Sequence, residues 1–261
     1  MEGQLDALRD GVAASFIAIW AHVLSAIPGA WTREQDGVLA GFSTAPVAMM
    51  NGVWVAGHNG DAALVEELMG DVAASGLPHC LQLRPGPAET LLELGPALGL
   101  AQCPDMPLLA LRDDEAVQRT RDAASVALRR IGPDESGLHC AVAAEGFGMP
   151  AQVLATVANP TMLALAEVSA YVAELDGTAV ATAVAIHLER HVGIFNVATH
   201  SQHRRRGFGA AVTAIAVGEA FDDGAEIAWL QSSEMGRGVY EALGFHLVES
   251  WKCWASTAPA G

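Results

Sequence analysis

Positive charge is scarce in this chain of 261 residues. Lys and Arg together number 14 against 30 Asp and Glu, so the formal net charge is -16 at pH 7, and Lys252 is the single lysine. Proteins that bind nucleic acid need a basic face, because the phosphate backbone supplies most of the non-specific binding energy. The acidic balance therefore argues against a general nucleic-acid-binding protein.

Cysteine is also sparse, and its spacing carries no metal or disulfide signature. The four cysteines are Cys80, Cys103, Cys140 and Cys253. No two of them form a Cys-x-x-Cys pair, and no group of His, Cys, Asp and Glu has the spacing of metal ligands, so we expect no metal site. The absence of a disulfide framework favours reduced thiols in a cytoplasmic protein.

Residues 11–30 lack charged side chains and form a long apolar stretch. The ten residues before it hold three acids and one arginine, so the positive flank of a signal peptide is missing. Apolar residues recur at spacings of three and four, as on one helix face, at Leu5, Leu8, Val12, Phe16, Ile19, Val23 and Ile27. We predict a buried amphipathic helix rather than a signal peptide or a membrane span.

The second half of the chain reads as an alternation of strands and helices. Predicted strands cover residues 125–131, 168–175, 179–188, 192–198, 226–231 and 246–254, and predicted helices cover 133–148, 151–157, 210–221 and 237–243. Asp176-Gly177 is a hairpin-turn signal, and Gly224 stands in the usual place just after a helix.

The first half repeats part of this order about 145 residues earlier. Its predicted strands are residues 52–56, 79–83 and 106–111, and its predicted helices are 62–75 and 89–98. Five elements in the same order indicate duplication of a whole domain. We therefore predict an α+β protein with two domains, residues 1–115 and 116–261, and a linker that begins near residues 113–115.

Residues 204–210, Arg-Arg-Arg-Gly-Phe-Gly-Ala, lie between a predicted strand and a predicted helix. Glycine lets the backbone approach a ligand closely, and a helix N-terminus adds partial positive charge. The segment is therefore suited to hold a phosphate or pyrophosphate. The corresponding stretch of the first half, residues 56–61, has no arginine and no Gly-x-Gly, so we expect one such site in the chain.

Gly207-x-Gly209 also occurs in dinucleotide-binding loops, but the wider pattern argues against that interpretation. The fingerprint requires a small residue three positions later, where Val212 stands, and it follows the first strand of its domain. A second motif, Tyr240 followed by Gly244-Phe245, lies on a short predicted helix. Taken alone, such a tyrosine is more often a packed aromatic residue than a catalytic one.

Together the two motifs resemble those of the GNAT superfamily of N-acetyltransferases. Arg204-x-x-Gly207-x-Gly209 is similar to its acetyl-CoA loop, and Tyr240-x-x-x-Gly244-Phe245 is similar to its downstream motif. The resemblance covers about residues 125–254 well. The first half of the chain resembles the family only weakly, as a degenerate copy. It implies two GNAT-like (acyl-CoA N-acyltransferase) domains, each a mixed, mostly antiparallel sheet flanked by helices, the first without a CoA loop.

The resemblance also implies roles for individual residues. A bulged strand at Val197, Ala198 and Thr199 would pair with pantetheine and polarise the thioester carbonyl. Tyr240 aligns with the general acid that protonates the departing thiolate. Ser233 stands where the family often has an Asn that contacts pantetheine. Backbone N–H groups and arginine side chains of the loop would hold the CoA pyrophosphate, through Arg204, Arg205, Arg206, Gly207, Phe208, Gly209 and Ala210.

The implied reaction is transfer of an acetyl group from acetyl-CoA to a primary amine of a small-molecule or peptide acceptor, by direct attack and without a metal. The amine needs a base, for which Glu167, His200 and Glu234 are the candidates. A non-catalytic acyl-CoA-binding sensor or scaffold is the alternative, because no base stands out. The sequence does not fix the acceptor or the oligomeric state, and we expect no nucleic-acid or membrane partner.

Overall fold

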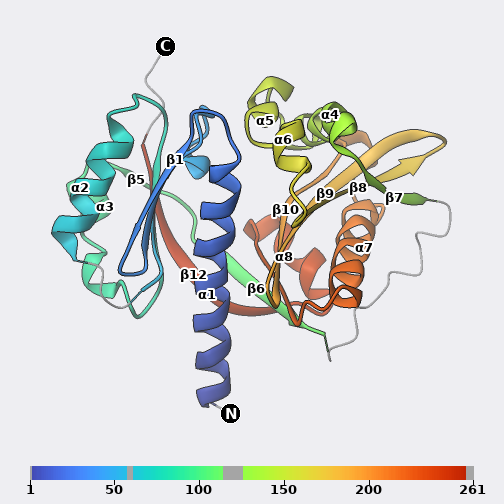
Figure 1. Ribbon diagram of the computed structural model, residues 1–261. Helices are drawn as coiled ribbons and strands as arrows, with labels where there is room; N and C mark the ends of the chain where they lie inside the picture. The colour runs from blue at the N-terminus through green and yellow to red at the C-terminus, as the bar shows by residue number, and fades with distance from the viewer. Residues whose placement is uncertain (1, 58–60, 114–125, 257–261) are drawn as a thin grey trace. The chain divides into compact units, whose positions relative to one another are not determined.

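The computed structural model describes residues 2–57, 61–113 and 126–256, and the chain divides into two compact units (Figure 1). Unit 1 comprises Met1–Leu108 and Val248–Gly261, and unit 2 comprises Leu109–Leu247. Each unit has a mixed, mostly antiparallel sheet flanked by helices, as predicted. The predicted domain boundary after residue 115 and most of the predicted linker lie outside the described residues.

The sheet of unit 1 has the order β1-β2-β3-β4-β12, with β5 beside β12. Only β3 and β4 are parallel among these described pairs. The strands are β1 (Trp31–Gln35), β2 (Val38–Phe42), β3 (Gly52–Val55), β4 (Cys80–Leu83), β5 (Ala101–Gln102) and β12 (His246–Ala255). The helices are α1 (Glu2–Ser25), α2 (Ala62–Ala73) and α3 (Leu94–Ala97), with 3-10 turns at Ala48–Met50 and Glu89–Leu91.

Helix α1 packs on the sheet of unit 1 through aromatic contacts. The rings of Phe16 and Trp251 of β12 have their centroids 5.0 Å apart. Trp20 meets Trp54 of β3 edge-on, with a centroid separation of 5.6 Å. These contacts remove large apolar surfaces from water and so fix the helix on the sheet.

The predicted apolar face of this helix is buried over its later part. Leu5 is exposed, whereas Val12, Phe16, Ile19, Val23 and Ile27 are buried. Gly3–Ser25 is also long and apolar enough to cross a membrane, although helices in the cores of soluble proteins and signal sequences near an N-terminus pass the same test.

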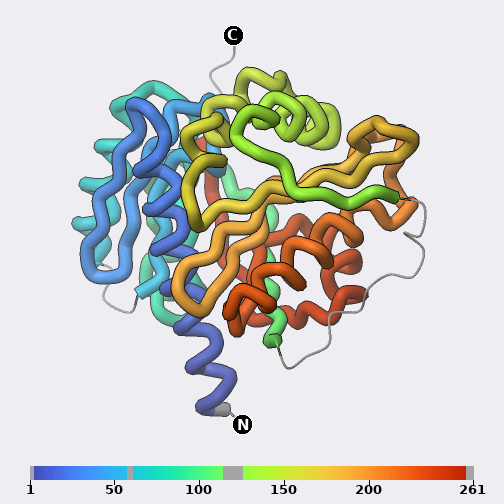
Figure 2. The backbone as a smooth tube through the Cα atoms, turned by 45° about the vertical axis from the view of Figure 1, so that its right-hand side comes forward, coloured from blue at the N-terminus to red at the C-terminus, as the bar shows by residue number. Residues whose placement is uncertain are grey.

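The sheet of unit 2 has the order β6-β11-β10-β9-β8-β7, in which β7 to β10 are antiparallel neighbours and β10 and β11 are parallel. Helices α4 to α6 lie on one face and α7 lies on the other (Figures 1 and 2). The strands are β6 (Met106–Arg112), β7 (Ala127–Ile131), β8 (Val168–Leu175), β9 (Thr178–Leu188), β10 (His191–Thr199) and β11 (Ile227–Gln231). The helices are α4 (Ser136–Phe147), α5 (Ala151–Val157), α6 (Pro160–Leu163), α7 (Phe208–Asp222) and α8 (Glu234–Glu241), with 3-10 turns at Pro133–Glu135 and Ser201–His203.

The two units exchange their last strands, a feature that the sequence analysis did not anticipate. From Val248 on, β12 belongs to unit 1, where Trp254 of β12 pairs with Leu81 of β4. Conversely, Leu109 and Leu111 of β6 belong to unit 2 and join its main hydrophobic cluster. The predicted strands 106–111 and 246–254 therefore exist, but each completes the sheet of the other half.

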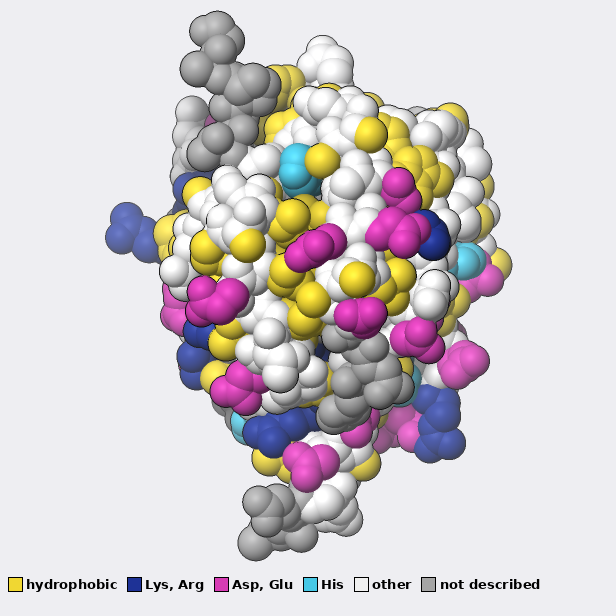
Figure 3. Space-filling view, turned by 90° about the vertical axis from the view of Figure 1, so that its left-hand side faces the viewer, with side chains coloured by type: hydrophobic (Ala, Val, Ile, Leu, Met, Phe, Trp, Pro, Cys, Tyr) yellow, Lys and Arg dark blue, Asp and Glu magenta, His cyan; other side chains and the backbone are white. Residues whose placement is uncertain are grey.

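The surface agrees with the acidic composition. Figure 3 shows acidic side chains dispersed between apolar and uncharged polar surface on one face, with most of the Lys and Arg side chains toward the edges of the view. On the described part of this face, cationic side chains form no continuous patch of the kind that a nucleic acid needs.

Candidate functional site

Strands β10 and β11 of unit 2 form a fork. Their parallel pairing ends at Gly193 with Trp229, although β10 continues to Thr199 and β11 to Gln231. Beyond the closed end of the fork, the two facing strand edges are no longer bonded to each other, which is an arrangement that can accept an added extended chain. The predicted cofactor-binding segment, residues 197–199, is the end of β10 along this fork.

A β-bulge bends β10 just past the closed end of the fork. Phe195 pairs with Val184 of β9, and the next pair joins Ala198 to Thr182, so β10 has one extra residue in this interval. Asn196 in the bulge has a left-handed φ of 51°. The bulge that the family resemblance implied is therefore present, and it lies where β10 is no longer paired with β11.

The arginine–glycine loop leads from β10 into α7 with an open helix N-terminus. Arg205 and Gly207 have left-handed φ angles of 60° and 82°, and Gly207 is the N-cap of α7. Glycine has no side chain with which to cap the helix. Within the described residues, the N–H groups of positions 205–210 meet no protein acceptor. They form the kind of site that binds an anion at a helix N-terminus.

The three loop arginines have different surroundings. Arg204 donates a hydrogen bond to the carbonyl of Gly146 in α4, so it ties the loop to that helix. The guanidinium of Arg206 lies 5.0 Å from the centre of the Phe208 ring, in a cation–π contact. Arg205 is exposed and has no side-chain partner among the described residues. Arg205 is therefore the loop arginine most available to a phosphate.

Gly209 allows the first turn of α7 to approach the end of β10. A Cβ atom at this position would lie 3.2 Å from Oγ1 of Thr199 and 3.9 Å from Cγ1 of Val197. The first of these distances is tighter than almost all real Cβ contacts, so a larger side chain would push the helix from the strand. The open helix N-terminus and the fork are therefore adjacent.

Tyr240 lies on α8 and packs against the core of unit 2. Its ring centroid is 6.2 Å from that of Phe245, and its carbonyl accepts the N–H of Phe245 at 3.0 Å. Its hydroxyl has no hydrogen-bond partner in the described part of the chain. Burial raises the pKa of Tyr240 to about 12, so the hydroxyl is protonated at neutral pH and can donate a proton.

Ser233, the predicted pantetheine contact, has a structural role at the start of the same helix. Its hydroxyl accepts a hydrogen bond from the N–H of Gly236 at 3.2 Å and caps α8. The side chain is exposed, so the cap leaves one face of the hydroxyl accessible.

The structure does not bring the three candidate bases together. Glu167 precedes β8 and lines a cavity of ≈ 70 Å³ with His187 of β9, on the α7 face of the sheet. His200 directly follows β10, and its Nε2 lies 3.9 Å from Oε1 of Glu145 in α4. Glu234 is exposed in the first turn of α8.

A buried histidine near the bulge was not found by sequence reasoning. Nδ1 of His139 in α4 lies 2.7 Å from Oγ1 of Thr182, the β9 residue that pairs with Ala198. Burial lowers the pKa of His139 to about 4, so the ring is neutral at physiological pH. A single histidine on an apolar helix face carries no sequence signal that separates it from an ordinary core residue.

The described residues of unit 1 form neither a fork nor an open helix N-terminus. Its parallel pair β3 and β4 stays bonded to the last pair, Val55 with Leu83, and the N–H of Arg84 then donates to the carbonyl of Val55 at 3.0 Å. Helix α2 is capped by Asp61, whose carboxylate accepts the N–H of Ala63. Residues 58–60 of the corresponding loop lie outside the described residues.

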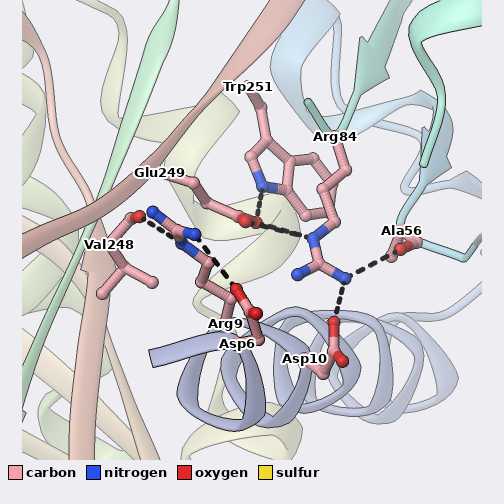
Figure 4. A network of polar contacts seen from close by, with 8 residues as sticks. All are labelled: Asp6, Arg9, Asp10, Ala56, Arg84, Val248, Glu249 and Trp251. Atoms are coloured by element: carbon pink, nitrogen blue, oxygen red, sulfur yellow. Dashed lines mark hydrogen bonds and ion pairs between the residues drawn. The ribbon is translucent and has the colours of Figure 1, made fainter. Parts of the chain in front are cut away.

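Arg84 also joins three segments of unit 1 (Figure 4). Its buried guanidinium donates to both carboxylate oxygens of Glu249 in β12, at 3.0 and 3.1 Å, and to the carbonyl of Ala56 at 3.3 Å. It also forms an ion pair of 2.8 Å with Asp10 of α1. The indole N–H of Trp251 donates to Glu249 at 2.6 Å. The Arg84 side chain thus lies across the ends of the parallel strands β3 and β4. In unit 2 the corresponding parallel strands, β10 and β11, separate to form the fork.

Comparisons with known proteins agree with this geometry. A model described as the acetyltransferase (GNAT) family matches residues 149–245. A solved GCN5-related N-acetyltransferase from Kribbella flavida is 22% identical, with a TM-score of 0.69 over 94% of this chain and 95% of that one. A second, from Sphaerobacter thermophilus, is 16% identical, with a TM-score of 0.62 over 86% and 78%.

A third solved structure matches nearly the whole chain. It is a tandem GNAT protein from the clavulanic acid biosynthesis pathway, 16% identical, with a TM-score of 0.55 over 97% of this chain and 96% of that one. At such identities the likeness shows the fold. No curated protein matches the chain.

Proposed function

Because residues 149–245 match the acetyltransferase (GNAT) family and the chain has a tandem GNAT fold, we propose that unit 2 transfers an acetyl group from acetyl-CoA to a primary amine. The observation that carries the proposal is the adjacency of the open fork and the uncapped N-terminus of α7, with Gly209 against Thr199. The fork would accept the extended pantetheine chain, and the N-terminus of α7 would accept the pyrophosphate.

The residues present fit acetyl-CoA. The unbonded N–H groups of positions 205–210 would hold the pyrophosphate, with the free guanidinium of Arg205 adding charge. The backbone edge of Val197 to Thr199 would pair with pantetheine, and one of its N–H groups would polarise the thioester carbonyl. Bound acetyl-CoA supplies the acyl group and a thiolate leaving group.

Tyr240 is proposed as the general acid. Its protonated hydroxyl, without a protein partner among the described residues, would give its proton to the sulfur as the carbon–sulfur bond breaks. Direct attack by the amine is proposed because unit 2 offers no activated thiol. Its one cysteine, Cys140, is buried, its thiol donates to the carbonyl of Ala158, and burial raises its pKa.

Unit 1 is proposed to be catalytically silent, so that each chain binds one acetyl-CoA. Its parallel strands stay paired to their ends, and Asp61 already places an anion at the N-terminus of α2. A second anion there would be repelled. We place the protein in the cytoplasm and propose a small-molecule or peptide amine as the acceptor.

Calorimetric titration of acetyl-CoA tests the site. Gly207→Val and Gly209→Val should each weaken binding at least tenfold, because one strains a left-handed backbone and the other pushes α7 from β10. Gly218→Val is the matched control, since it lies on the same helix with open space around it. Undiminished binding in the first two variants would remove the site assignment.

A non-catalytic acyl-CoA sensor is the second candidate function. The separate positions of Glu167, His200 and Glu234 favour it, since the three candidate bases lie on different elements and form no common site. Tight CoA binding without thiol release across a broad panel of amines would support the sensor, and thiol release with any amine would rule it out.

A further inference from the structure

Three of the four cysteines lie close together in unit 1, although the sequence separates them widely. Cys80 is on β4, Cys253 is on β12, and Cys103 directly follows β5. Cys80 and Cys253 are buried, whereas Cys103 is partly exposed. The proposed acyl transfer uses none of these thiols, so they are free to have a separate role.

Cys103 and Cys253 are direct neighbours across two strands. β5 and β12 are antiparallel, and the pair Gln102 with Trp254 places Cys103 opposite Cys253 in the same register. The N–H of Cys103 donates to the carbonyl of Cys253 at 2.9 Å. Cα atoms of such a pair are about 5.5 Å apart. That separation is within the range of about 4.4–6.8 Å that a disulfide spans.

The same register argument excludes the third cysteine as a partner. Cys80 lies opposite Ala255, and Cys253 lies opposite Gln82, so the two cysteines are diagonal neighbours in the ladder. Diagonal positions are about 7–8 Å apart, which is too far for a disulfide without movement of the backbone.

The two thiols of the pair differ in their access to solvent. Burial, with Cys103 and Asp105 close by, raises the pKa of Cys253 to about 12, so this sulfur stays protonated until it reacts. Cys103 is the partly exposed member, so it is the residue of the pair that a small oxidant would reach first.

We propose that Cys103 and Cys253 are a redox-active pair that a low-molecular-weight disulfide, such as oxidised glutathione, converts into a disulfide bond. The Cys103 sulfur loses its proton to solvent and attacks one sulfur of the small disulfide, which releases one thiol and leaves a mixed disulfide. The Cys253 sulfur then loses its proton, attacks Sγ of Cys103 and releases the second thiol. The protein gives up two electrons and two protons, and the small disulfide takes them up as two thiols.

The bond ties β12, whose chain arrives from unit 2, to the segment that follows β5. A cross-link between residues so far apart in sequence restricts the unfolded chain more than a local one does. The oxidised protein is therefore expected to have a higher Tm than the reduced protein.

Peptide mapping after oxidation tests the proposal. The full chain is incubated with oxidised glutathione, quenched in acid, alkylated and cleaved after glutamate, which places Cys103 in residues 94–115, Cys253 in residues 250–261 and Cys80 on another peptide. We expect the first two peptides to be linked. Cys103→Ser should abolish the link, and Cys80→Ser and Cys140→Ser, the matched controls, should leave it intact.

Two results would overturn the proposal: a link that involves Cys80, or glutathione retained on Cys103 with no link to Cys253. The wild-type map alone distinguishes these results, so the test does not depend on the folding of any variant. Reduction with dithiothreitol should restore both free thiols and the lower Tm.

Discussion

The carboxylate of Asp61 accepts a hydrogen bond from the N–H of Ala63 at 3.2 Å and so caps α2 in unit 1. The equivalent place before α7 in unit 2 is held by Gly207, which has no side chain to offer. The first helix therefore has a carboxylate at its N-terminus that accepts one of its N–H groups, whereas the second leaves its N-terminal N–H groups for a ligand.

Asp61→Ala should destabilise unit 1 and leave the cofactor site unchanged. Loss of the cap is expected to cost about 1 kcal/mol of unfolding free energy, measured by urea denaturation. The Kd for acetyl-CoA, measured by calorimetry, should stay at the wild-type value, because the proposed site lies in unit 2. A weaker Kd in this variant would show that unit 1 takes part in binding.

Gly207→Asp should weaken acetyl-CoA binding more than Gly207→Asn. Both side chains tolerate a left-handed φ and have nearly the same shape, so the comparison isolates the charge. A carboxylate beside the proposed pyrophosphate site is expected to weaken the Kd by about fivefold or more beyond the Asn variant. Equal Kd values in the two variants would mean that no anion lies at this helix N-terminus.

Tyr240→Phe should slow turnover while the Kd for acetyl-CoA stays the same. Loss of a general acid is expected to lower kcat about 10²-fold. Tyr171→Phe is the control, since Tyr171 is the other tyrosine of the chain and its hydroxyl donates to Glu219. Because the pKa of Tyr240 is about 12, the acid stays protonated as the pH rises from 7 to 10. Loss of this proton should therefore cause no fall in kcat over that range.

Arg84→Met should strongly destabilise unit 1. The change leaves the buried carboxylate of Glu249 without its cation, which is expected to cost about 3–5 kcal/mol of unfolding free energy in urea denaturation. Arg33→Met is the matched control, because the pair of Arg33 with Glu67 is exposed to solvent and its loss should change the free energy of unfolding little. A double variant with Glu249→Met should recover much of the loss.

Acidification should destabilise unit 2 through His139. Its pKa is lowered to about 4 in the folded protein, against an ordinary value of 6.5, so the unfolded chain binds this proton first as the pH falls. The contribution of neutral His139 to the free energy of unfolding is fully present above pH 6.5. It is lost as the pH falls from 6.5 to 4, and the loss is about 3 kcal/mol. His139→Gln should flatten this part of the profile of unfolding free energy against pH. A profile unchanged from wild type would contradict the assignment.

Much of unit 2 was predictable because its signals are local. The helix predicted at residues 210–221 is α7, and the turn at Asp176-Gly177 joins β8 to β9. The bulge in β10 was predicted from the family resemblance alone, because nothing in the residues around Asn196 requires it. Turn-forming residues and helical periodicity are patterns of residues close together in the chain, so a single sequence is enough to detect them.

The exchange of β6 and β12 was not predictable from periodicity. The alternation of apolar and polar residues in a strand indicates which face is buried. It does not indicate which sheet the strand joins. The Arg84–Glu249 pair depends on this exchange, as it joins residues 165 positions apart in the chain. Likewise, the proximity of Cys103 and Cys253 arises from strand register and not from spacing along the sequence.

The exchange of strands also sets an order in which the protein can be completed during synthesis. Most of unit 1 is encoded before unit 2, yet the part of β12 that pairs with both β4 and β5 follows the whole of unit 2 in the chain. Domains usually fold from the N-terminus as they emerge. Here the sheet of the earlier unit keeps an open edge until unit 2 and the residues from Val248 on have been made, and a chain that stops before residue 248 leaves that sheet incomplete.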